Sequence, residues 1–445
     1  MKPKVPVRQA QRELFRVELD QLVDPAHALV KLGRQINWTG FDESLGQTYA
    51  LANGAPGVST RLMVALHYLK YRHDLSDEAV VGQWVENPYW QHFSGEQFFQ
   101  HEMPIDPSSM TRWRKRLGEA GAEAMLKETI ETGLRMKVIT PAQIQHINVD
   151  TTVQTKAVRY PTDARLYNRS RERLVKTARK LGLQIKQSYE RVGPRLLMQQ
   201  SRYAHARQPK RAASCTRKLR TALGRVIRQI EREHPTPTAQ LSELLTTAKR
   251  IHAQQPQDKN KVYSVHEPKV ACIAKGKAGK KYEFGNKVSV AATSRGGWLL
   301  GALSLPDNPY DGHTLDQQLS QTRRLLGTKA PPAPEAHVDM GYRGHHHTGP
   351  EIVYIDKCRR GTTPQSLWRR MKRRAAVEPT IGHMKSEHRL ERNRLKGTTG
   401  DAINALLSAA AMNFQKQLGF FLYLWLRLCS LLWLPPVISI SPVTA

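Results

Sequence analysis

The chain has 445 residues, 40% of them hydrophobic, and it lacks the glycine and proline enrichment of disordered chains. This length allows two or three domains and a sizeable buried core. Lysine and arginine number 69 against 38 acidic residues, which gives a net charge of +31. Binding to a polyanion relieves the self-repulsion of such a surplus. We therefore expect a nucleic acid as the partner and no small-molecule substrate; the alternative is a ribosome-associated or merely basic soluble protein.

The cysteines and the N-terminus indicate the cellular compartment. The four cysteines lie far apart, without the spacing of zinc or redox motifs: Cys215, Cys272, Cys358 and Cys429. Reduced thiols of this kind are typical of the cytosol. The basic N-terminus is not followed by an apolar run, so a secretory signal is not expected. We expect a cytoplasmic protein.

Residues 1–135 are expected to form an N-terminal helical domain. Ser59 and Ser76 stand where helix N-caps are expected. A basic helix follows residues 107–109 and ends at Gly118. Its candidate DNA contacts are Arg112, Arg114 and Lys115. Several short helices with a basic last one are typical of a helix-turn-helix-like DNA-binding module, although a plain helical bundle fits nearly as well.

Residues 136–164 and 256–415 alternate strand and helix signals, which predicts an α/β catalytic domain with a mixed sheet. The expected strands are residues 145–153, 269–273, 282–292, 298–305, 336–340 and 352–355. A hairpin is expected at residues 293–297, a helix at 314–326 and a long helix from about residue 365. The first strand carries Asp150 near its end, on the face opposite Val149.

Residues 165–255, between the first two strands, are expected to be a basic helical insertion. Apolar residues recur at helical spacing, as in Leu174, Ala178, Leu181 and Ile185. Residues 165–233 hold 20 lysines and arginines against four acids, a surplus of 16. The one-sided charge favours contact with DNA phosphates over a merely solvated face. The candidate contacts are Arg217, Lys218, Arg220 and Arg225.

Residues 416–445 form an apolar tail. Residues 418–434 are nearly all apolar, and at 17 residues they sit at the lower limit for a membrane span. Two prolines, Pro435 and Pro436, would stop a helix there. We expect a buried or dimer-forming segment, or a dispensable extension, rather than a membrane anchor.

Three carboxylates are candidates for metal chemistry. Asp150 and Asp339 each lie close to the end of an expected strand. Singly, each could cap a loop, but together they could share metals, and oxygen ligands suit Mg²⁺ or Mn²⁺. Residues 373–385 are expected to be helical, with Arg374, Glu378 and Lys385 on one stripe. The alternative for Glu378 is an ordinary intrahelical ion pair, and Pro379 would kink the helix beside it.

These three segments resemble the catalytic blocks of bacterial insertion-sequence DDE transposases, in the group named after insertion sequences four and five. The third block of that group is Tyr, two residues, Arg, three residues, Glu, six residues, Lys. Arg374, Glu378 and Lys385 fit this spacing, whereas Met371 stands at the tyrosine position. Residues 263–292, with His266-Glu267-Pro268-Lys269, also resemble the group, and the resemblance spans about residues 50–415.

The resemblance implies a ribonuclease-H-like catalytic fold with a helical insertion between its first two strands. It implies that Asp150, Asp339 and Glu378 bind metal and are catalytic, with two Mg²⁺ or Mn²⁺ ions per active site. Arg374 and Lys385 would contact DNA phosphate. The expected partners are transposon inverted-repeat ends and target DNA, bound by a homodimer. The resemblance also implies a bacterial protein associated with the nucleoid. The expected reaction is phosphodiester hydrolysis followed by joining of the 3′-hydroxyl ends. The rival hypotheses are a catalytically silent repressor and a metal-dependent nuclease without strand joining.

Three further motifs carry weaker signals. Adjacent histidines at His345, His346 and His347 rarely converge on one metal ion. The glycine- and lysine-rich residues 275–281 lack the spacing of a phosphate-binding P-loop and predict a basic hairpin turn. Asp311 is expected to cap a helix, with a place near the active site as the alternative.

Overall fold

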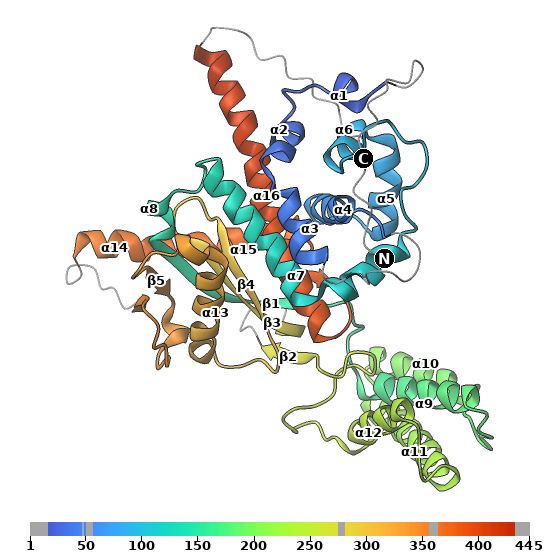
Figure 1. Cartoon of the computed structure of the whole chain (residues 1–445). Helices are drawn as coiled ribbons and strands as arrows, with labels where there is room; N and C mark the ends of the chain where they lie inside the picture. The colour runs from blue at the N-terminus through green and yellow to red at the C-terminus, as the bar shows by residue number, and fades with distance from the viewer. Residues whose placement is uncertain (1–16, 47–48, 50–56, 275–280, 356–363, 432–445) are drawn as a thin grey trace.

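The sheet forms the centre of the protein, and helices from both ends of the chain pack on it (Figure 1). The computed structural model describes residues 17–46, 49, 57–274, 281–355 and 364–431, with side chains to residue 421. The expected α/β class with a mixed, open sheet is confirmed. The expected basic turn at residues 275–281 lies almost wholly outside the described residues.

The sheet is built around its first strand. Its members are β1 (His146–Lys156), β2 (Ala271–Ala274), β3 (Tyr282–Thr293), β4 (Leu299–Leu305), β5 (Glu335–Val338), β6 (Ile352–Ile355) and β7 (Arg392–Asn393). β3 runs antiparallel to β1, β2 and β4, whereas β5 runs parallel to β1 and β6. Gly296 and Gly297 have positive φ angles of 81° and 58°, which a tight turn between β3 and β4 requires. The expected hairpin is therefore present.

The C-terminal third supplies the helices beside the sheet. They are α13 (Asp311–Leu326), η1 (Gly327–Lys329), η2 (Met340–Tyr342), α14 (Gln365–Lys372), η3 (Arg373–Ala376), α15 (Val377–Ser386) and α16 (Gly397–Leu431). The long helix expected from residue 365 is wrong, because a 3₁₀ turn divides it into α14 and α15. Pro379 lies in the first turn of α15, where its missing N–H costs little.

The N-terminal helices do not have a core of their own. They are α1 (Leu19–Leu22), α2 (Ala28–Gln35), α3 (Trp38–Gly46), α4 (Thr60–Arg72), α5 (Asp77–Glu86), α6 (Pro88–Phe93), α7 (Ser108–Arg135) and α8 (Pro141–Ile144). Their buried side chains join those of the sheet in one hydrophobic cluster. Within α7 the backbone breaks at Gly118, with φ 61°, where the basic helix was expected to end. Ser76 accepts a hydrogen bond from the Ala79 N–H, as its expected N-cap role requires.

α16 links the two regions. It packs against α2, α4 and α7 on one side and β4 on the other, and it buries residues such as Leu406 and Phe414 (Figure 1). The helix crosses residue 416, so the start of the apolar tail continues a buried core element. Within the described residues, every helix is too short or too polar to cross a membrane.

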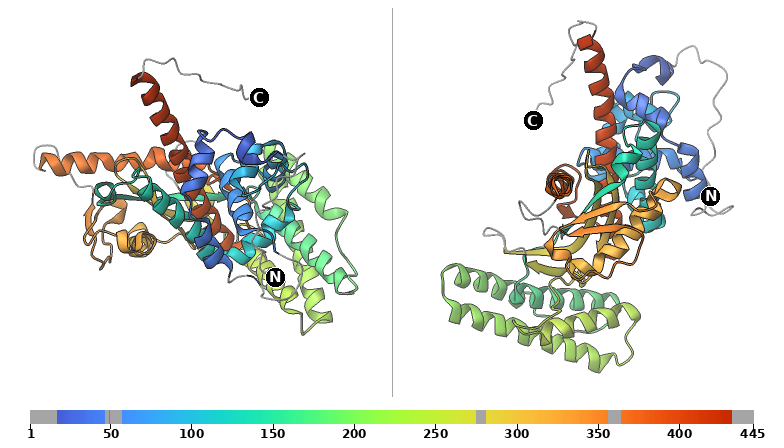
Figure 2. Two further views of the ribbon diagram at one scale, coloured as in Figure 1. Left: turned by 45° about the horizontal axis from the view of Figure 1, so that its top comes forward. Right: turned by 90° about the vertical axis from the view of Figure 1, so that its left-hand side faces the viewer.

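The insertion between β1 and β2 has its own hydrophobic core. It consists of α9 (Asp163–Lys180), α10 (Val192–His205), α11 (Pro209–Glu233) and α12 (Ala239–Ala253). The apolar faces of α9, α11 and α12 meet in this core, and the four helices project from the sheet (Figure 2). The expected repeat through Leu181 and Ile185 is wrong, because α9 ends before Leu181 and Gly182 adopts a positive φ of 76°.

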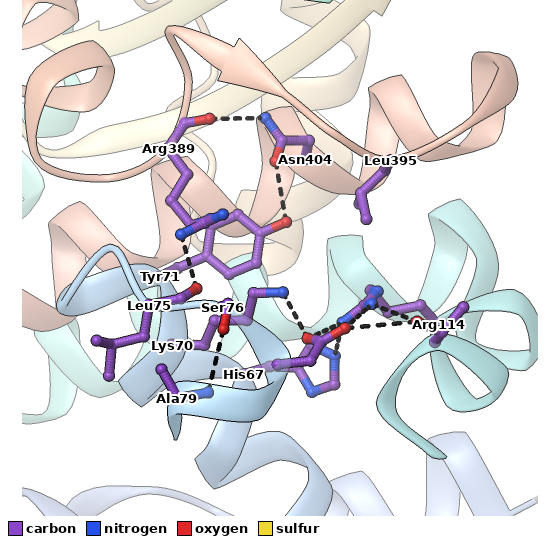
Figure 3. A network of polar contacts seen from close by, with 12 residues as sticks. His67, Lys70, Tyr71, Leu75, Ser76, Ala79, Arg114, Arg389, Leu395 and Asn404 are labelled. Carbon is purple, nitrogen blue, oxygen red and sulfur yellow. Dashed lines mark hydrogen bonds and ion pairs between the residues drawn. The ribbon is translucent and has the colours of Figure 1, made fainter. Parts of the chain in front are cut away.

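A buried ion pair holds α4, α5 and α7 together. Asp77, at the start of α5, accepts hydrogen bonds from Arg114 at 2.8 and 2.5 Å and from Lys70 at 2.5 Å. Lys70 and Arg114 point toward this carboxylate from α4 and α7 (Figure 3). Burial alone would raise the pKa of Asp77, but its bonds to Arg114 and Lys70 outweigh burial and hold it well below its ordinary value. The expected DNA contact by Arg114 is therefore corrected, since its guanidinium is buried and paired.

We expect Asp77→Asn to lower the free energy of unfolding by about 3 kcal/mol at neutral pH, because it leaves two cations buried without their counter-ion. The folded-state pKa of Asp77 is depressed. The stabilisation is therefore present above the unfolded pKa, about 3.9, and is lost as the pH falls further. Urea denaturation at several pH values measures both effects. The matched control is Glu78→Gln, at the exposed neighbouring position, and an equal drop in the control would contradict this interpretation.

Candidate active site

Asp150 occupies the middle of the central strand. It is the fifth of the eleven residues of β1 and pairs with Val290 of β3, so the expectation that it lies near the strand end is wrong. Its side chain is 20% exposed, and its Oδ1 accepts the Thr151 N–H at 2.7 Å. A carboxylate in the middle of a sheet is costly to keep charged unless cations or hydrogen bonds compensate it.

The parallel pairing of β5 with β1 places Asp339 beside Asp150. His146 pairs with Glu335, and Asn148 pairs with His337. Asp150 follows His146 by four residues, and Asp339 likewise follows Glu335 by four residues. Side chains two and four residues apart along a strand share one face of a sheet. Asp339 follows β5 directly and caps η2, where its Oδ1 accepts the Gly341 N–H at 2.9 Å.

Glu378 approaches from the helical layer. It is the second residue of α15, which packs against β1. The Asn148 Nδ2 donates to the Arg373 carbonyl at 3.0 Å and thereby fixes η3 on the face that carries Asp150. The helical stripe expected for Arg374, Glu378 and Lys385 is divided between η3 and α15.

The pKa of Asp150 shows that the three carboxylates are electrostatic neighbours. Burial contributes most in raising this pKa to about 6. The Thr151 N–H and Arg374 lower it, whereas the negative charges of Asp339 and Glu378 raise it further. Two segments separated from Asp150 by long stretches of sequence thus act on one carboxyl group. The expected convergence of the three acids is consistent with this coupling.

Arg374 lies beside the acids, and Lys385 lies farther along the same helical layer. The Arg374 Nη1 lies 4.0 Å from the Asp150 Oδ2, and the Arg374 side chain is only 15% exposed. Lys385 is half-buried near the end of α15. Arg374 is thus placed to offset part of the negative charge of Asp150.

Asp311 is a fourth acid beside this site, although sequence reasoning assigned it mainly to a helix cap. Its Oδ1 accepts hydrogen bonds from the Thr151 Oγ1 and the Lys287 Nζ, both at 2.9 Å. A Cβ added at Gly341 would lie 3.0 Å from the Asp339 Oδ1 and 3.4 Å from the Asp311 Oδ2, so these carboxylates flank one glycine. The helix-capping role expected for Asp311 is wrong, because α13 begins after Tyr310 without a side-chain cap.

The donors fit divalent metals better than the histidine run does. Carboxylate oxygens gathered in this way suit Mg²⁺ or Mn²⁺, because a bound cation offsets the repulsion that Asp339 and Glu378 exert on the Asp150 carboxylate. His347 instead bridges Asp316 and Glu351 at 2.9 and 3.0 Å, while the His346 ring stacks on His313. The three adjacent histidines therefore point to different neighbours.

The remaining DNA-contact candidates lie away from the acids. Arg112 and Lys115 are exposed on α7, and Arg217 and Lys218 are exposed on α11. Two others on α11 are engaged within the insertion. Arg220 is half-buried and donates to the His252 carbonyl, and the exposed Arg225 donates to the Tyr189 hydroxyl.

Because Asp150 has a raised pKa, its ionised form destabilises the metal-free protein. We expect Asp150→Asn to stabilise the fold above pH 6 by on the order of 2 to 3 kcal/mol, since an amide keeps the shape without the charge. The difference should shrink as the pH falls below 6 and vanish below about pH 3, where the wild-type carboxyl is protonated in both the folded and the unfolded state. Thermal unfolding in a chelator measures this; equal or lower stability of the variant at pH 7.5 would contradict the assignment.

Comparison with known proteins identifies two transposase domains in the chain. Residues 17–116 match a transposase domain (DUF772), and residues 346–418, which include Glu378, match a transposase DDE domain. The chain is 50% identical over 208 residues to an uncharacterised protein, ORF8 of the nfe locus of Rhizobium meliloti; the match covers 47% of this chain and all of that protein. No solved structure matches. The chain thus belongs to the same family as this rhizobial protein, and its two matched domains are those of a DDE transposase.

Proposed function

We propose that this transposase binds transposon ends, hydrolyses phosphodiester bonds with two divalent metal ions, and joins the freed 3′-hydroxyl groups to target DNA. The observation that carries the proposal is the coupling of Asp150 to Asp339 and Glu378, with Arg374 at 4.0 Å from Asp150. We further infer a ribonuclease-H-like catalytic domain. The strand order β4-β3-β1-β5-β6, antiparallel on one side of β1 and parallel on the other, supports this inference.

Asp150, Asp339 and Glu378 would hold Mg²⁺ or Mn²⁺. When bound, such a pair of ions activates water and stabilises the leaving oxygen. The protein keeps its acids on two rigid strands and one helix start, so their positions are set before DNA arrives. Arg374 offsets their charge and would contact the phosphate, and Lys385 would contact it from the same helical layer. The Asp311 hydrogen bond to Thr151 would hold the β1 backbone beside Asp150.

A basic segment suggests how DNA approaches this domain. Arg392, Arg394 and Lys396 are exposed in and after β7, which pairs with the end of β1. Arg394 and Lys396 line one groove against the insertion and another against α4 and α5. Since both grooves share these cations, a phosphate backbone could pass from the N-terminal helices to the insertion along them. Binding as a homodimer to inverted-repeat ends is also part of the proposal.

Asp150→Asn, Asp339→Asn and Glu378→Gln should each reduce Mg²⁺-dependent cleavage by several orders of magnitude while leaving DNA binding nearly intact. Double variants should be little worse than single ones, because the acids act as one unit. The assay uses the flanking DNA of the gene, with mapped cleavage and joining products. Glu387→Gln, an exposed acid just beyond α15, is the control.

The outcomes separate the rival functions. Full cleavage by Asp150→Asn would refute the assigned site. Cleavage by the wild-type protein without joined products would indicate a nuclease, and binding without cleavage would indicate a repressor.

Replacing Arg217, Lys218, Arg220 and Arg225 by alanine should weaken binding similarly for all DNA sequences. The slope of log K against log salt should fall by about 0.9 for each phosphate that is no longer neutralised. Because Arg220 and Arg225 have partners within the insertion, we expect Arg217 and Lys218 to account for most of the change. Thr221→Ala, an exposed uncharged position between them on α11, is the control. An unchanged slope would show that the insertion does not bind DNA phosphates.

A further inference from the structure

A second cluster of ligand atoms lies on the face of the sheet that carries the catalytic acids. His146, Glu335 and His337 each offer a ligand atom, and these atoms lie within 4.8 Å of one another. They come from the first residues of the paired strands β1 and β5. Within the described part of the chain, no other three histidine, cysteine or acidic side chains bring their ligand atoms this close together.

The spacing of these atoms fits a transition-metal ion. The Glu335 Oε2 lies 3.1 Å from the His146 Nδ1 and 3.4 Å from the His337 Nε2. Ligand bonds of about 2.0 to 2.1 Å in tetrahedral geometry separate the ligand atoms by about 3.3 Å. Two of the three distances between the ligand atoms thus already match a tetrahedral metal site. Imidazole nitrogens with one carboxylate suit Zn²⁺ rather than Mg²⁺.

The burial and hydrogen bonding of His337 support a metal site independently of these distances. Its side chain is fully buried, yet its Nε2 makes no hydrogen bond, because the contact with Glu335 lacks hydrogen-bond geometry. A buried polar atom normally has a hydrogen-bond partner, so this nitrogen is available to a further ligand. The His146 side chain is 34% exposed, so solvent can reach the cluster. A metal ion would satisfy His337 and keep one coordination position open to water.

Arg370 of α14 already pairs with Glu335, at 2.5 Å from Oε1 and 2.7 Å from Oε2. A carboxylate has about four lone-pair positions, so it can bind an arginine and a metal at once. Arg370 would then orient Glu335, although its positive charge would weaken cation binding.

We propose that His146, Glu335 and His337 form a Zn²⁺ site that is separate from the catalytic acids. His146 and Glu335 lie four residues before Asp150 and Asp339, about 13 Å along the strands, and His337 lies two residues before Asp339, about 7 Å, at about 3.3 Å per residue. One ion therefore cannot share both sites. A bound Zn²⁺ would join the beginnings of β1 and β5, the strands whose pairing aligns the two aspartates.

The test uses the full-length, untagged, metal-stripped protein in excess Mg²⁺, titrated with Zn²⁺ against a chromophoric chelator. We expect one tight Zn²⁺ per chain and a higher Tm with Zn²⁺. His146→Ala and His337→Ala should each weaken binding at least tenfold, whereas Arg370→Gln should strengthen it. If the three residues formed only a hydrogen-bonded cluster without metal, the histidine variants and Arg370→Gln would not change Zn²⁺ binding in opposite directions.

The controls locate the site. His345→Ala and His346→Ala test the competing histidine run, and Asp150→Asn tests the catalytic acids; all three should retain Zn²⁺ binding. His146→Ala, at the more exposed ligand, covers the case in which His337→Ala fails to fold. Unchanged Zn²⁺ affinity in His146→Ala, or weakened affinity in His345→Ala, would overturn the proposal. Loss of binding in Asp150→Asn would overturn its independence from the catalytic site. Since the readout is binding, its failure would leave the cleavage proposal untouched.

Discussion

The parallel pairing of β1 with β5 is the interaction on which the site depends. Its register pairs His146 with Glu335 and Asn148 with His337, and Asp150 and Asp339 each follow two residues later on the same face. A shift by one residue would turn one of the aspartates to the opposite face of the sheet. The pairing therefore has to be held firmly. Both strands carry small or branched apolar residues on alternate positions, such as Val149 and Ala336, and these are fully buried.

Helices from both ends of the chain support this pairing. α16 packs against β4 and against α4 and α7, so the sheet and the N-terminal helices share one core. Polar contacts follow the same path. Asn404 of α16 donates to Gln154 of β1 and accepts from the Tyr71 hydroxyl of α4 (Figure 3). Because buried polar groups are costly to leave unpaired, this network fixes one orientation of α16 relative to β1. The matched N-terminal and C-terminal domains are thus parts of one folded unit, while the insertion keeps a separate core.

The sequence was most informative where a pattern is local. The strands, the hairpin at Gly296 and most of the amphipathic helices follow from alternation, turn residues and helical spacing, and these elements are present. The break at η3 was missed because Pro379 permits either a kink or a new helix start, and only the contact between Asn148 and the Arg373 carbonyl decides. Arg114 was assigned to the surface because the sequence does not show that Asp77 would fold against it. The place of Asp311 beside the active site was not predicted, because its partners Thr151 and Lys287 lie on β1 and β3, far from it in the sequence.

The charge distribution links the fold to the reaction. The protein carries a large positive surplus, yet it places four acids around the middle of β1 and the start of α13. Burial, together with the negative charges of Asp339 and Glu378, raises the pKa of Asp150, so this carboxyl group is costly to ionise. Two cations offset part of this negative charge. Arg374 lies 4.0 Å from the Asp150 carboxylate, and Lys287 lies 2.9 Å from the Asp311 carboxylate. The remaining negative charge makes the site attractive to divalent cations, and the surrounding lysines and arginines make the surface attractive to DNA. The negative charge of the site is unfavourable for the isolated protein. Divalent cations and DNA, the two kinds of ligand that the proposed reaction requires, would compensate the charges of the site and of the surface around it.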